Sequence, residues 1–380
     1  MYPHFSMRVN DLHASPIREI LSVIDRPGMI SFAGGLPSVD SFPRFSLEDM
    51  PVSTLQYGPS EGDWALREQI AQELATQGLT CKPEQVLVLS GSQQGIDLVA
   101  KLFIDQGTSV AVESPTYLAA LQVFRFFDAR FAPYDAEAVD TQQWLREKPA
   151  FAYAIPTFQN PTGRCLSADA RAELARACDA ANVPLFEDDP YRDLVYDDCD
   201  RSPLCAHLQK APWIYQGSFS KSLAPGLRLG YLVASPELLP YLMRLKQAAD
   251  LHSNRMSQWL VLQQLRDPQR QERLTALAQS YRQRRDAFDA ALKRHLGSLA
   301  RWQIPAGGLF FWLTLNQKLD TRLLLVEAIK VGVAFMPGEP FMPLETQATG
   351  QLRLNFSHAS EEQAERGLAA LAKLIKEHAI

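Results

Sequence analysis

Short apolar runs alternate with amphipathic stretches through the middle of the chain. The runs are β-rich and typical of buried strands, and they lie at residues 85–89, 109–112, 150–155, 183–186, 213–217 and 229–234. Helical patterns separate them at residues 96–103, 117–126 and 167–181, where Ser167 is a candidate N-cap. Strands separated by helices predict a mostly parallel sheet covered on both faces. In such sheets ligands bind at the carboxyl ends of the strands.

The pattern changes at both ends of the chain. After about residue 285, strands at 310–313 and 352–356 and an amphipathic helix at 361–378 predict a smaller α+β domain. The first forty-odd residues are rich in Gly, Pro and Ser, and they predict a short helix around 17–24 followed by an extended arm. We therefore expect three parts, listed in chain order: an N-terminal helix and arm that belong to the small domain and act as a substrate lid (1–45), a large domain (46–285) and a C-terminal small domain (286–380).

Composition narrows the class of protein. The chain is 46% hydrophobic and 21% charged, as ordinary globular proteins are. A formal net charge of −5 argues against sequence-independent nucleic-acid binding. No apolar run is long enough to span a membrane, and the start lacks the apolar segment of a secretory signal. Five cysteines without C-x-x-C spacing indicate reduced thiols in a cytoplasmic protein, and seven scattered histidines without an H-E-x-x-H pair give a metal site little support.

Polar residues follow several of the strand-like runs. Gly91-Ser92-Gln93 lies where a strand leads into a helix, and this junction suits a phosphate or, alternatively, simple helix capping. Asp188, in Glu187-Asp188-Asp189-Pro190-Tyr191, could hold a cationic ring nitrogen, and Tyr191 could serve an anionic ring oxygen; the alternative is a solvated acidic turn. Asn160-Pro161-Thr162-Gly163 is a strong turn signal in which Asn160 could donate to a phenolate oxygen.

Three further side chains are candidates for the same crevice. Tyr117 could stack on a flat aromatic ring or be ordinary half-buried packing. Arg353 lies in an otherwise apolar strand and needs a partner, either a substrate carboxylate or an internal salt bridge. Lys221 lies among small hydroxyl residues in Gly217-Ser218-Phe219-Ser220-Lys221, and an arginine, Arg228, follows seven positions later. A lysine can form a Schiff base with an aldehyde, so Lys221 and Arg228 together suit a cofactor with an aldehyde and a phosphate, which is pyridoxal phosphate (PLP).

The order of these residues resembles one family. They occur as Tyr57, Gly91-Ser92-Gln93, Tyr117, Asn160-Pro161-Thr162-Gly163, Asp188-x-x-Tyr191, Ser218-x-x-Lys221, Arg228 and Arg353. This set resembles the class I aminotransferases (class I/II family) of PLP fold type I, from about residue 31 to 356. The chain is similar in particular to the α-aminoadipate and kynurenine aminotransferase branch, through Ser-x-Ile-Arg-Glu-Ile at 15–20, Ile-Ser-Phe-Ala-Gly-Gly-Leu-Pro at 30–37 and the Tyr-Gly-x-x-x-Gly-x-x-x-Leu-Arg of 57–67. The resemblance implies an α/β fold with a mostly parallel seven-stranded sheet in the large domain and a smaller α+β domain.

The resemblance also implies roles around the cofactor ring. Lys221 would hold PLP as a Schiff base and then move the proton between Cα and C4′. Asp188 would keep the pyridine nitrogen protonated, while Tyr191 and Asn160 would bind the ring oxygen and Tyr117 would stack on the ring. The catalytic residues would thus be Lys221, Asp188 and Tyr191.

Phosphate and substrate contacts follow from the same resemblance. The phosphate would be bound by Gly91, Ser92, Gln93, Ser218 and Arg228, with Tyr57 reaching in from the second subunit of a homodimer. Substrate would meet Arg353 at its α-carboxylate, with Gly35 and Asn160 alongside. Arg18, on the N-terminal helix, would meet the side-chain carboxylate of an acidic substrate; the alternative for Arg18 is a solvated surface position.

The implied activity is an amino transfer in two half-reactions. An L-amino acid of the 2-aminoadipate, aromatic or aliphatic type would leave its amine on the cofactor, and a 2-oxo acid, expected to be 2-oxoglutarate, would collect it. The alternatives are another PLP reaction on the same fold (a decarboxylase, a β-lyase or a cyclising synthase) and, last, a regulatory aminotransferase-like domain. The regulatory class is disfavoured because similarity begins within the first fifteen or so residues and leaves no room for a DNA-binding domain.

Overall fold

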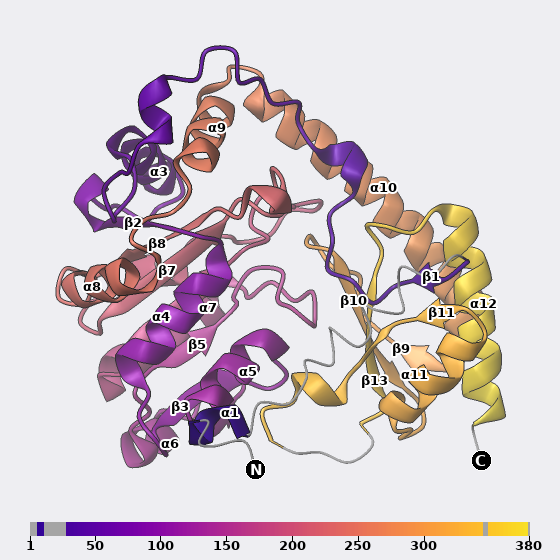
Figure 1. The fold of residues 1–380 in the computed structure, drawn as a ribbon. Coiled ribbons are helices and arrows are strands. Elements are labelled where there is room, and N and C mark those ends of the chain that lie inside the picture. The colour runs from indigo at the N-terminus through magenta and orange to yellow at the C-terminus, as the bar shows by residue number, and fades with distance from the viewer. Residues whose placement is uncertain (1–5, 11–27, 345–348, 379–380) are drawn as a thin grey trace, which may run out of the picture.

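The computed structural model describes residues 6–10, 28–344 and 349–378 of the chain. These residues form two lobes, and the long helix α10 (Arg270–Leu296) runs from one to the other along one edge of the molecule (Figure 1). The helix predicted at 17–24 lies outside the described residues.

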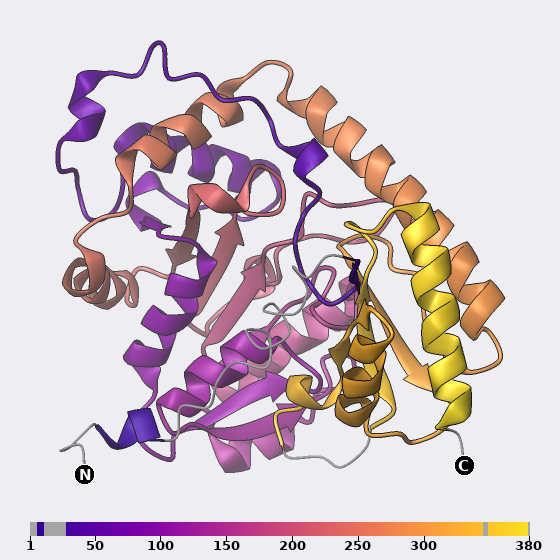
Figure 2. The same ribbon diagram turned by 45° about the vertical axis from the view of Figure 1, so that its right-hand side comes forward.

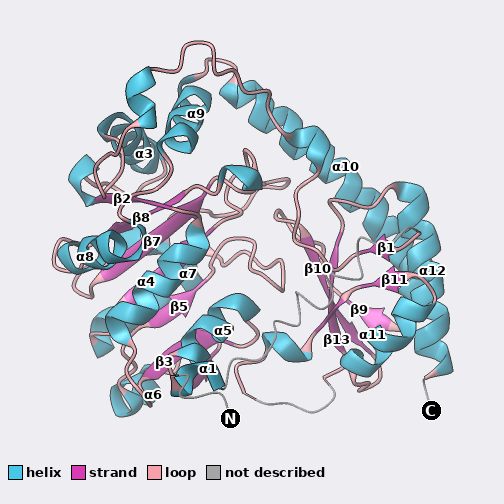
Figure 3. Cartoon of the chain, in the orientation of Figure 1, coloured by secondary structure: helices cyan, strands magenta, loops and turns pink. Residues whose placement is uncertain are grey.

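The larger lobe contains the predicted sheet, drawn in magenta on the left of Figure 3. Its strand order is β2-β8-β7-β6-β5-β3-β4. The strands from β7 to β4 pair in parallel, and β8 is antiparallel to both of its neighbours. The fold-class prediction of a mostly parallel seven-stranded sheet is therefore confirmed. In chain order the strands are β2 Val86–Leu89, β3 Ser109–Glu113, β4 Arg130–Tyr134, β5 Ala152–Ala154, β6 Leu185–Asp189, β7 Trp213–Ser218 and β8 Gly230–Ala234.

The apolar pattern missed one strand of this sheet, β4. Its sequence, Arg-Phe-Ala-Pro-Tyr, contains a proline and begins with a charged residue, so it does not read as a buried strand. The strand forms the edge of the sheet, next to β3 alone. A proline is tolerated on an edge strand because its missing N–H faces away from the ladder.

Helices cover both faces of the sheet, as the alternating pattern predicted. The core on one face includes apolar residues of α4, α5 and α8, such as Ile96, Phe124 and Leu242. The core on the other face includes residues of α3, α6, α7 and α9, such as Ile70 and Leu174. The helices of this lobe are α3 Trp64–Thr76, α4 Ser92–Phe103, α5 Leu118–Phe126, α6 Thr141–Glu147, α7 Ala168–Ala181, α8 Leu239–Asp250 and α9 Arg255–Arg266. Ser167 caps α7 as expected, because its side chain accepts from the Ala170 N–H.

The smaller lobe is an antiparallel sheet packed against helices. Its four strands lie in the order β12-β13-β10-β9, and a separate parallel pair joins β1 to β11. The helix α12 packs along the C-terminal part of α10, as Figure 2 shows on the right. The strands are β1 Ile30–Ser31, β9 Ala300–Arg301, β10 Phe310–Leu315, β11 Val333–Ala334, β12 Met336–Pro337 and β13 Gln351–Asn355, and the helices are α11 Thr321–Lys330 and α12 Glu361–Glu377.

Short elements complete the described chain. The four-residue helix α1 (Met7–Asn10) precedes the arm, and 3₁₀ turns lie at Val39–Ser41, Val52–Leu55, Pro83–Gln85, Leu204–His207, Pro225–Leu227 and Glu339–Phe341. The expected boundary between residues 285 and 286 falls inside α10, and the three-part division stays a prediction. None of the helices in the described part of the chain is long and apolar enough to cross a bilayer.

Candidate active site

A cavity of about 280 Å³ lies where the loops after the parallel strands face the smaller lobe. Ligand sites of open α/β sheets occur at this edge, because the loops from several strand ends converge there. Most of the residues expected from the sequence meet in this cavity. Its lining consists of Ala33, Gly34, Gly35, Leu36, Ser92, Gln93, Tyr117, Ile155, Asn160, Asp188, Pro190, Tyr191, Ser218, Ser220, Lys221, Arg228, Met336 and Arg353.

Lys221 presents a buried amine to this cavity. It follows β7, and its Nζ donates to the Gly35 carbonyl at 2.8 Å and lies 5.9 Å from the centroid of the Tyr191 ring. Burial, together with the positive charges of Arg353 and Arg228, lowers the pKa of Lys221 to about 8. The neutral amine is therefore accessible at mildly alkaline pH, and this form attacks an aldehyde.

Asp188 differs from the two acidic residues beside it on β6. Side chains alternate between the two faces of a strand, so Glu187 and Asp189 point to one face and Asp188 to the other. Glu187 accepts the backbone N–H groups of Leu204 and Cys205. Asp189 pairs with Arg192 at 3.2 Å. All three carboxyl groups are buried, so the solvated acidic turn considered from the sequence is excluded.

The hydrogen-bond partners of Asp188 are both neutral. Its Oδ2 accepts from the Tyr153 hydroxyl at 2.7 Å, and its Oδ1 accepts from Gln216 Nε2 at 2.9 Å. Burial raises the pKa of Asp188 to about 6, although these two hydrogen bonds oppose the shift. A cationic group in the cavity would favour the ionised form, and a protonated ring nitrogen is such a group.

The start of α4 forms a corner with the geometry that suits an anion. Gly91 is its N-cap with φ 83°, and no side chain caps the first N–H groups. A Cβ on Gly91 would lie 2.5 Å from Arg228 Nη2, so the glycine lets the guanidinium approach the helix start. The hydroxyls of Ser92, Ser218 and Ser220 line the same cavity. Free N–H groups at a helix start with a nearby arginine suit a phosphate.

Arg353 faces this corner from β13 of the smaller lobe. Its Nη1 donates to Asn160 Oδ1 and its Nη2 to the Ala33 carbonyl, both at 2.7 Å. Its guanidinium carbon lies 4.1 Å from the ring centroid of Phe310 and 5.2 Å from that of Phe341. Among the described residues it forms no ion pair, and its Nε is buried without a hydrogen-bond partner. Burial lowers the pKa of Arg353 to about 10. The internal salt bridge considered for Arg353 is therefore absent among the described residues. The other partner considered is a substrate carboxylate.

Of the two tyrosines of the cavity, Tyr191 is buried and Tyr117 is half-buried. Tyr117 is the N-cap residue of α5, and burial raises its pKa to about 12. Burial likewise raises the pKa of Tyr191 above its usual range, while a hydrogen bond with Asn160 opposes the shift. Both phenols therefore stay protonated at neutral pH and can donate hydrogen bonds.

Tyr57 and Gly91, two of the expected site residues, do not line this cavity. Tyr57 is 76% exposed and lies in a separate surface cleft, with its ring centroid 5.7 Å from that of His252. Arg18 lies outside the described residues. Gly91 stands just behind the cavity wall, against Arg228.

Sequence reasoning missed three contributors to the site: Tyr153, Gln216 and Ser220. Tyr153 and Gln216 lie on β5 and β7, the two strands that flank β6, and Gln216 is the register partner of Asp188. The order of the strands would have exposed this relation, but strand order is not readable from the apolar pattern. Ser220 could have been predicted from the sequence, because it lies in the same hydroxyl-rich segment as Lys221.

The chemical groups that line the cavity match the aldehyde, the ring nitrogen and the phosphate of PLP. Lys221 would supply an amine for the aldehyde. Asp188, which has no cationic partner among the described residues, would supply a carboxylate for the ring nitrogen. The start of α4 with Arg228 would hold the phosphate, and Arg353, unpaired with any carboxylate in the described part of the chain, would hold the substrate. The donor set therefore fits the cofactor.

Comparisons with known proteins agree with this chemistry. The family model described as "Aminotransferase class I and II" matches residues 40–371. The aromatic-amino-acid aminotransferase 1 of Thermococcus litoralis is 34% identical, over 98% of this chain and 94% of its own length. The α-aminoadipate aminotransferase of Thermus thermophilus, solved with N-(5′-phosphopyridoxyl)-L-leucine, is 36% identical with a TM-score of 0.89 and covers 98% of this chain and 97% of its own. The kynurenine aminotransferase of Pyrococcus horikoshii, solved in complex with PMP, is 32% identical with a TM-score of 0.91 and covers 98% and 97%. The chain therefore belongs to the class I and II aminotransferases, of PLP fold type I, and is a PLP-dependent enzyme that transfers the amino group of amino acids.

Proposed function

We propose that the enzyme moves the α-amino group of an L-amino acid of the 2-aminoadipate, aromatic or aliphatic type to 2-oxoglutarate in two half-reactions. The observation that carries this proposal is that Lys221 and Arg353 line one cavity, with no carboxylate paired to Arg353 among the described residues. The Lys221 amine can attack the aldehyde of the cofactor. The buried Arg353 guanidinium can bind the α-carboxylate of an amino acid.

The proposed roles follow from the contacts of each side chain. PLP, when bound, supplies an electron sink that stabilises the carbanion formed at the substrate Cα. Lys221 anchors the cofactor and moves the proton between Cα and C4′. Asp188, held by Tyr153 and Gln216, keeps the ring nitrogen protonated. Tyr117 covers the ring, and Tyr191 donates to its oxygen.

The substrate side of the proposal rests on Arg353 and Asn160. Arg353 binds the α-carboxylate while Asn160 holds its Nη1 at 2.7 Å. The Gly35 backbone lies against the substrate in this proposal. The support is that Gly35 lines the cavity and that its carbonyl accepts from Lys221 Nζ. Leu36 and Met336 line the cavity nearby and suit apolar side chains. Acidic side chains need a further cation, for which we propose Arg18.

We also propose a homodimer in which Tyr57 completes the phosphate site of the neighbouring subunit. The support is that Tyr57 is largely exposed and outside the cavity of its own chain. Tyr57→Phe should weaken PLP binding without changing the subunit fold, and sedimentation of the wild-type protein should give a dimer mass. A monomer with full PLP affinity would contradict this part.

The test of the proposed function is a substrate panel. The PLP-loaded protein is mixed with single L-amino acids, and release of the matching 2-oxo acid and of pyridoxamine phosphate is followed. We expect 2-aminoadipate, aromatic or aliphatic donors to react, and 2-oxoglutarate to restore the starting absorbance faster than pyruvate does. Carbon dioxide release in place of a 2-oxo acid, or no restoration by 2-oxoglutarate, would overturn the proposal.

A further inference from the structure

Two cysteines outside the active site lie together at the junction of the two lobes. Cys165 follows the turn at residues 160–162, and Cys199 lies in the segment that connects β6 to the 3₁₀ turn at Leu204–His207. Both side chains are partly exposed, and neither is in a disulfide. The Cys165 thiol donates to the carbonyl of Asp200, the residue after Cys199, at 3.1 Å, so the two cysteines lie on adjoining segments.

Buried positive charge stands next to the Cys165 sulfur. Arg171 Nη2 donates to Cys165 Sγ at 3.6 Å, and the thiol also contacts the Asp200 carbonyl at 3.1 Å. The Arg171 side chain is fully buried. Its other hydrogen-bond acceptors are neutral, namely the Leu166, Ser202, Pro156 and Asp200 carbonyls and the Thr157 hydroxyl. Arg171 Nε also forms an ion pair with the Asp200 carboxylate at 3.8 Å. A thiolate at Cys165 would be a second anion, 3.6 Å from Arg171 Nη2.

The pKa values of the two thiols are shifted in opposite directions. The hydrogen bond from Cys199 lowers the pKa of Cys165 to about 7, with help from Arg171 and against the effect of burial. The same hydrogen bond and burial raise the pKa of Cys199 above its usual range. Cys165, whose sulfur accepts from Arg171 Nη2 at 3.6 Å, is thus the nucleophile of the pair, and Cys199 is the second thiol.

The other cysteines lack this arrangement. Burial raises the pKa of the partly exposed Cys81 to about 11, and no partner opposes the shift. Cys178 and Cys205 are buried, and burial raises the pKa of each well above its usual range. Reactivity with an electrophile should therefore be confined to Cys165.

We propose that Cys165 and Cys199 form a peroxide-sensitive pair that closes to a disulfide. The Cys165 thiolate attacks one oxygen of a hydroperoxide, the O–O bond breaks, and Cys165 becomes a sulfenic acid while the leaving oxygen takes up a proton. The Cys199 sulfur then loses its proton and attacks the Cys165 sulfur, so the S–O bond breaks and water leaves. With hydrogen peroxide, two thiols are oxidised to one disulfide and the peroxide is reduced to two waters.

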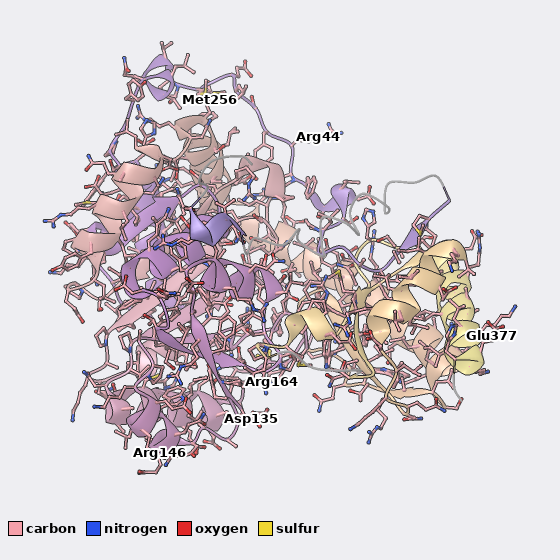
Figure 4. All side chains as sticks on the ribbon, turned by 60° about the horizontal axis from the view of Figure 1, so that its bottom comes forward. Arg44, Asp135, Arg146, Arg164, Met256 and Glu377 are labelled. Carbon is pink, nitrogen blue, oxygen red and sulfur yellow. The ribbon has the colours of Figure 1, made fainter. Side chains whose placement is uncertain are left out.

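A disulfide between Cys165 and Cys199 would link two segments that contact the smaller lobe. The turn before Cys165 carries Asn160, whose side chain accepts from Arg353. The segment before Cys199 reaches the smaller lobe through the bridge between Val195 and Gly307 and the ion pair of Asp197 with Arg285. Figure 4 labels Arg164, the neighbour of Cys165, at the seam between the two lobes. A disulfide would join this turn to this segment.

The test treats the PLP-loaded protein with hydrogen peroxide and counts free thiols by alkylation and mass spectrometry. We expect the five thiols to fall by two, a mass about 2 Da lower than before, and a Cys165–Cys199 peptide that a dithiol removes. At pH 7 the untreated protein should alkylate at Cys165 on the order of a hundredfold faster than at Cys81, because a larger thiolate fraction outweighs a weaker intrinsic nucleophile.

Three variants complete the test. Cys199→Ser should stop at the sulfenic acid, which dimedone traps on Cys165, and Cys165→Ser should lose both the disulfide and the trapped adduct. Cys81→Ser, a matched control with a partly exposed thiol, should behave as the wild type does. Retention of all thiols in peroxide, or loss of two thiols in Cys165→Ser, would overturn the proposal, and the alkylation rates of the wild type judge it independently of variant folding.

Discussion

The sheet side of the cavity and its small-lobe side differ in how their charged groups are held. On the sheet side, Asp188 is fixed by Tyr153 and Gln216 from the two adjacent strands of the same sheet. On the small-lobe side, Arg353 is fixed by Asn160 and Ala33, which belong to two other segments of the chain. The sheet side is therefore set by one rigid element, whereas the position of Arg353 depends on how three segments meet.

We infer from this difference that the two sides of the cavity serve different functions, cofactor binding and substrate binding. A cofactor that stays bound through many cycles needs a site that is formed in advance, and a sheet with residues from neighbouring strands provides one. A substrate that enters and leaves needs a contact that lobe movement can make and release. We expect changes on the sheet side to affect chemistry and cofactor binding, and changes at Arg353 to affect substrate binding.

The largest effect should come from Lys221→Ala. Because Lys221 is proposed to be both the covalent anchor and the proton carrier, removal of its amine should lower kcat by about 1000-fold or more. Steady-state transamination assays measure this. Lys101→Ala, which changes an exposed lysine paired with Asp97, should keep wild-type kcat; a Lys221→Ala enzyme with comparable turnover would contradict the account.

Asp188→Asn should come next, because it removes the charge and keeps the shape. We expect kcat to fall on the order of 100-fold, since a neutral amide does not favour a protonated ring nitrogen. The pH dependence gives a second readout. Burial raises the pKa of Asp188 to about 6 in the PLP-free protein, so the wild-type affinity for PLP should rise as pH increases through 6 and then level off.

The variant supplies the control for this pH dependence. The phosphate of the cofactor also titrates near pH 6, and its contribution is common to both proteins. The difference between wild type and Asp188→Asn, measured by equilibrium titration of PLP, isolates the carboxyl group. Parallel curves for the two proteins would refute the proposed pairing with the ring nitrogen.

Arg353→Lys should separate the two sides most clearly. An ammonium cannot reproduce the two-pronged contact or the packing between Phe310 and Phe341. We expect kcat/KM for the amino donor to fall about 100-fold, mainly through KM, while PLP affinity changes little. Loss of PLP affinity equal to the loss in kcat/KM would show that the two sides are not separable.

Gly91→Ala should give the smallest effect, confined to the phosphate corner. The added Cβ would meet the Arg228 guanidinium and would also strain a residue at φ 83°. We expect PLP to bind about tenfold more weakly, a cost of about 1.4 kcal/mol. Gly226→Ala, where a Cβ meets nothing within 4 Å, is the matched control, and equal affinities in the two variants would remove Gly91 from the phosphate corner.

The sequence predicts features that lie within one strand or motif, and it does not predict contacts between separate segments. Apolar runs located the interior strands, because strands buried on both faces are continuously hydrophobic. They missed β4, whose proline and arginine suit an edge. Ordered motifs located Lys221, Asp188 and Arg228, whereas Tyr153 and Gln216 became visible only with the strand order. The aromatic rings on either side of Arg353 come from two separate segments of the smaller lobe, and no local pattern connects them.

Covalent capture of the cofactor tests the central assignment most directly. The protein is loaded with PLP, reduced with borohydride, digested and mapped by mass spectrometry, with unreduced protein as the control. The account predicts a phosphopyridoxyl group on Lys221 and on no other lysine. A modified lysine elsewhere, with Lys221 unmodified, would contradict it.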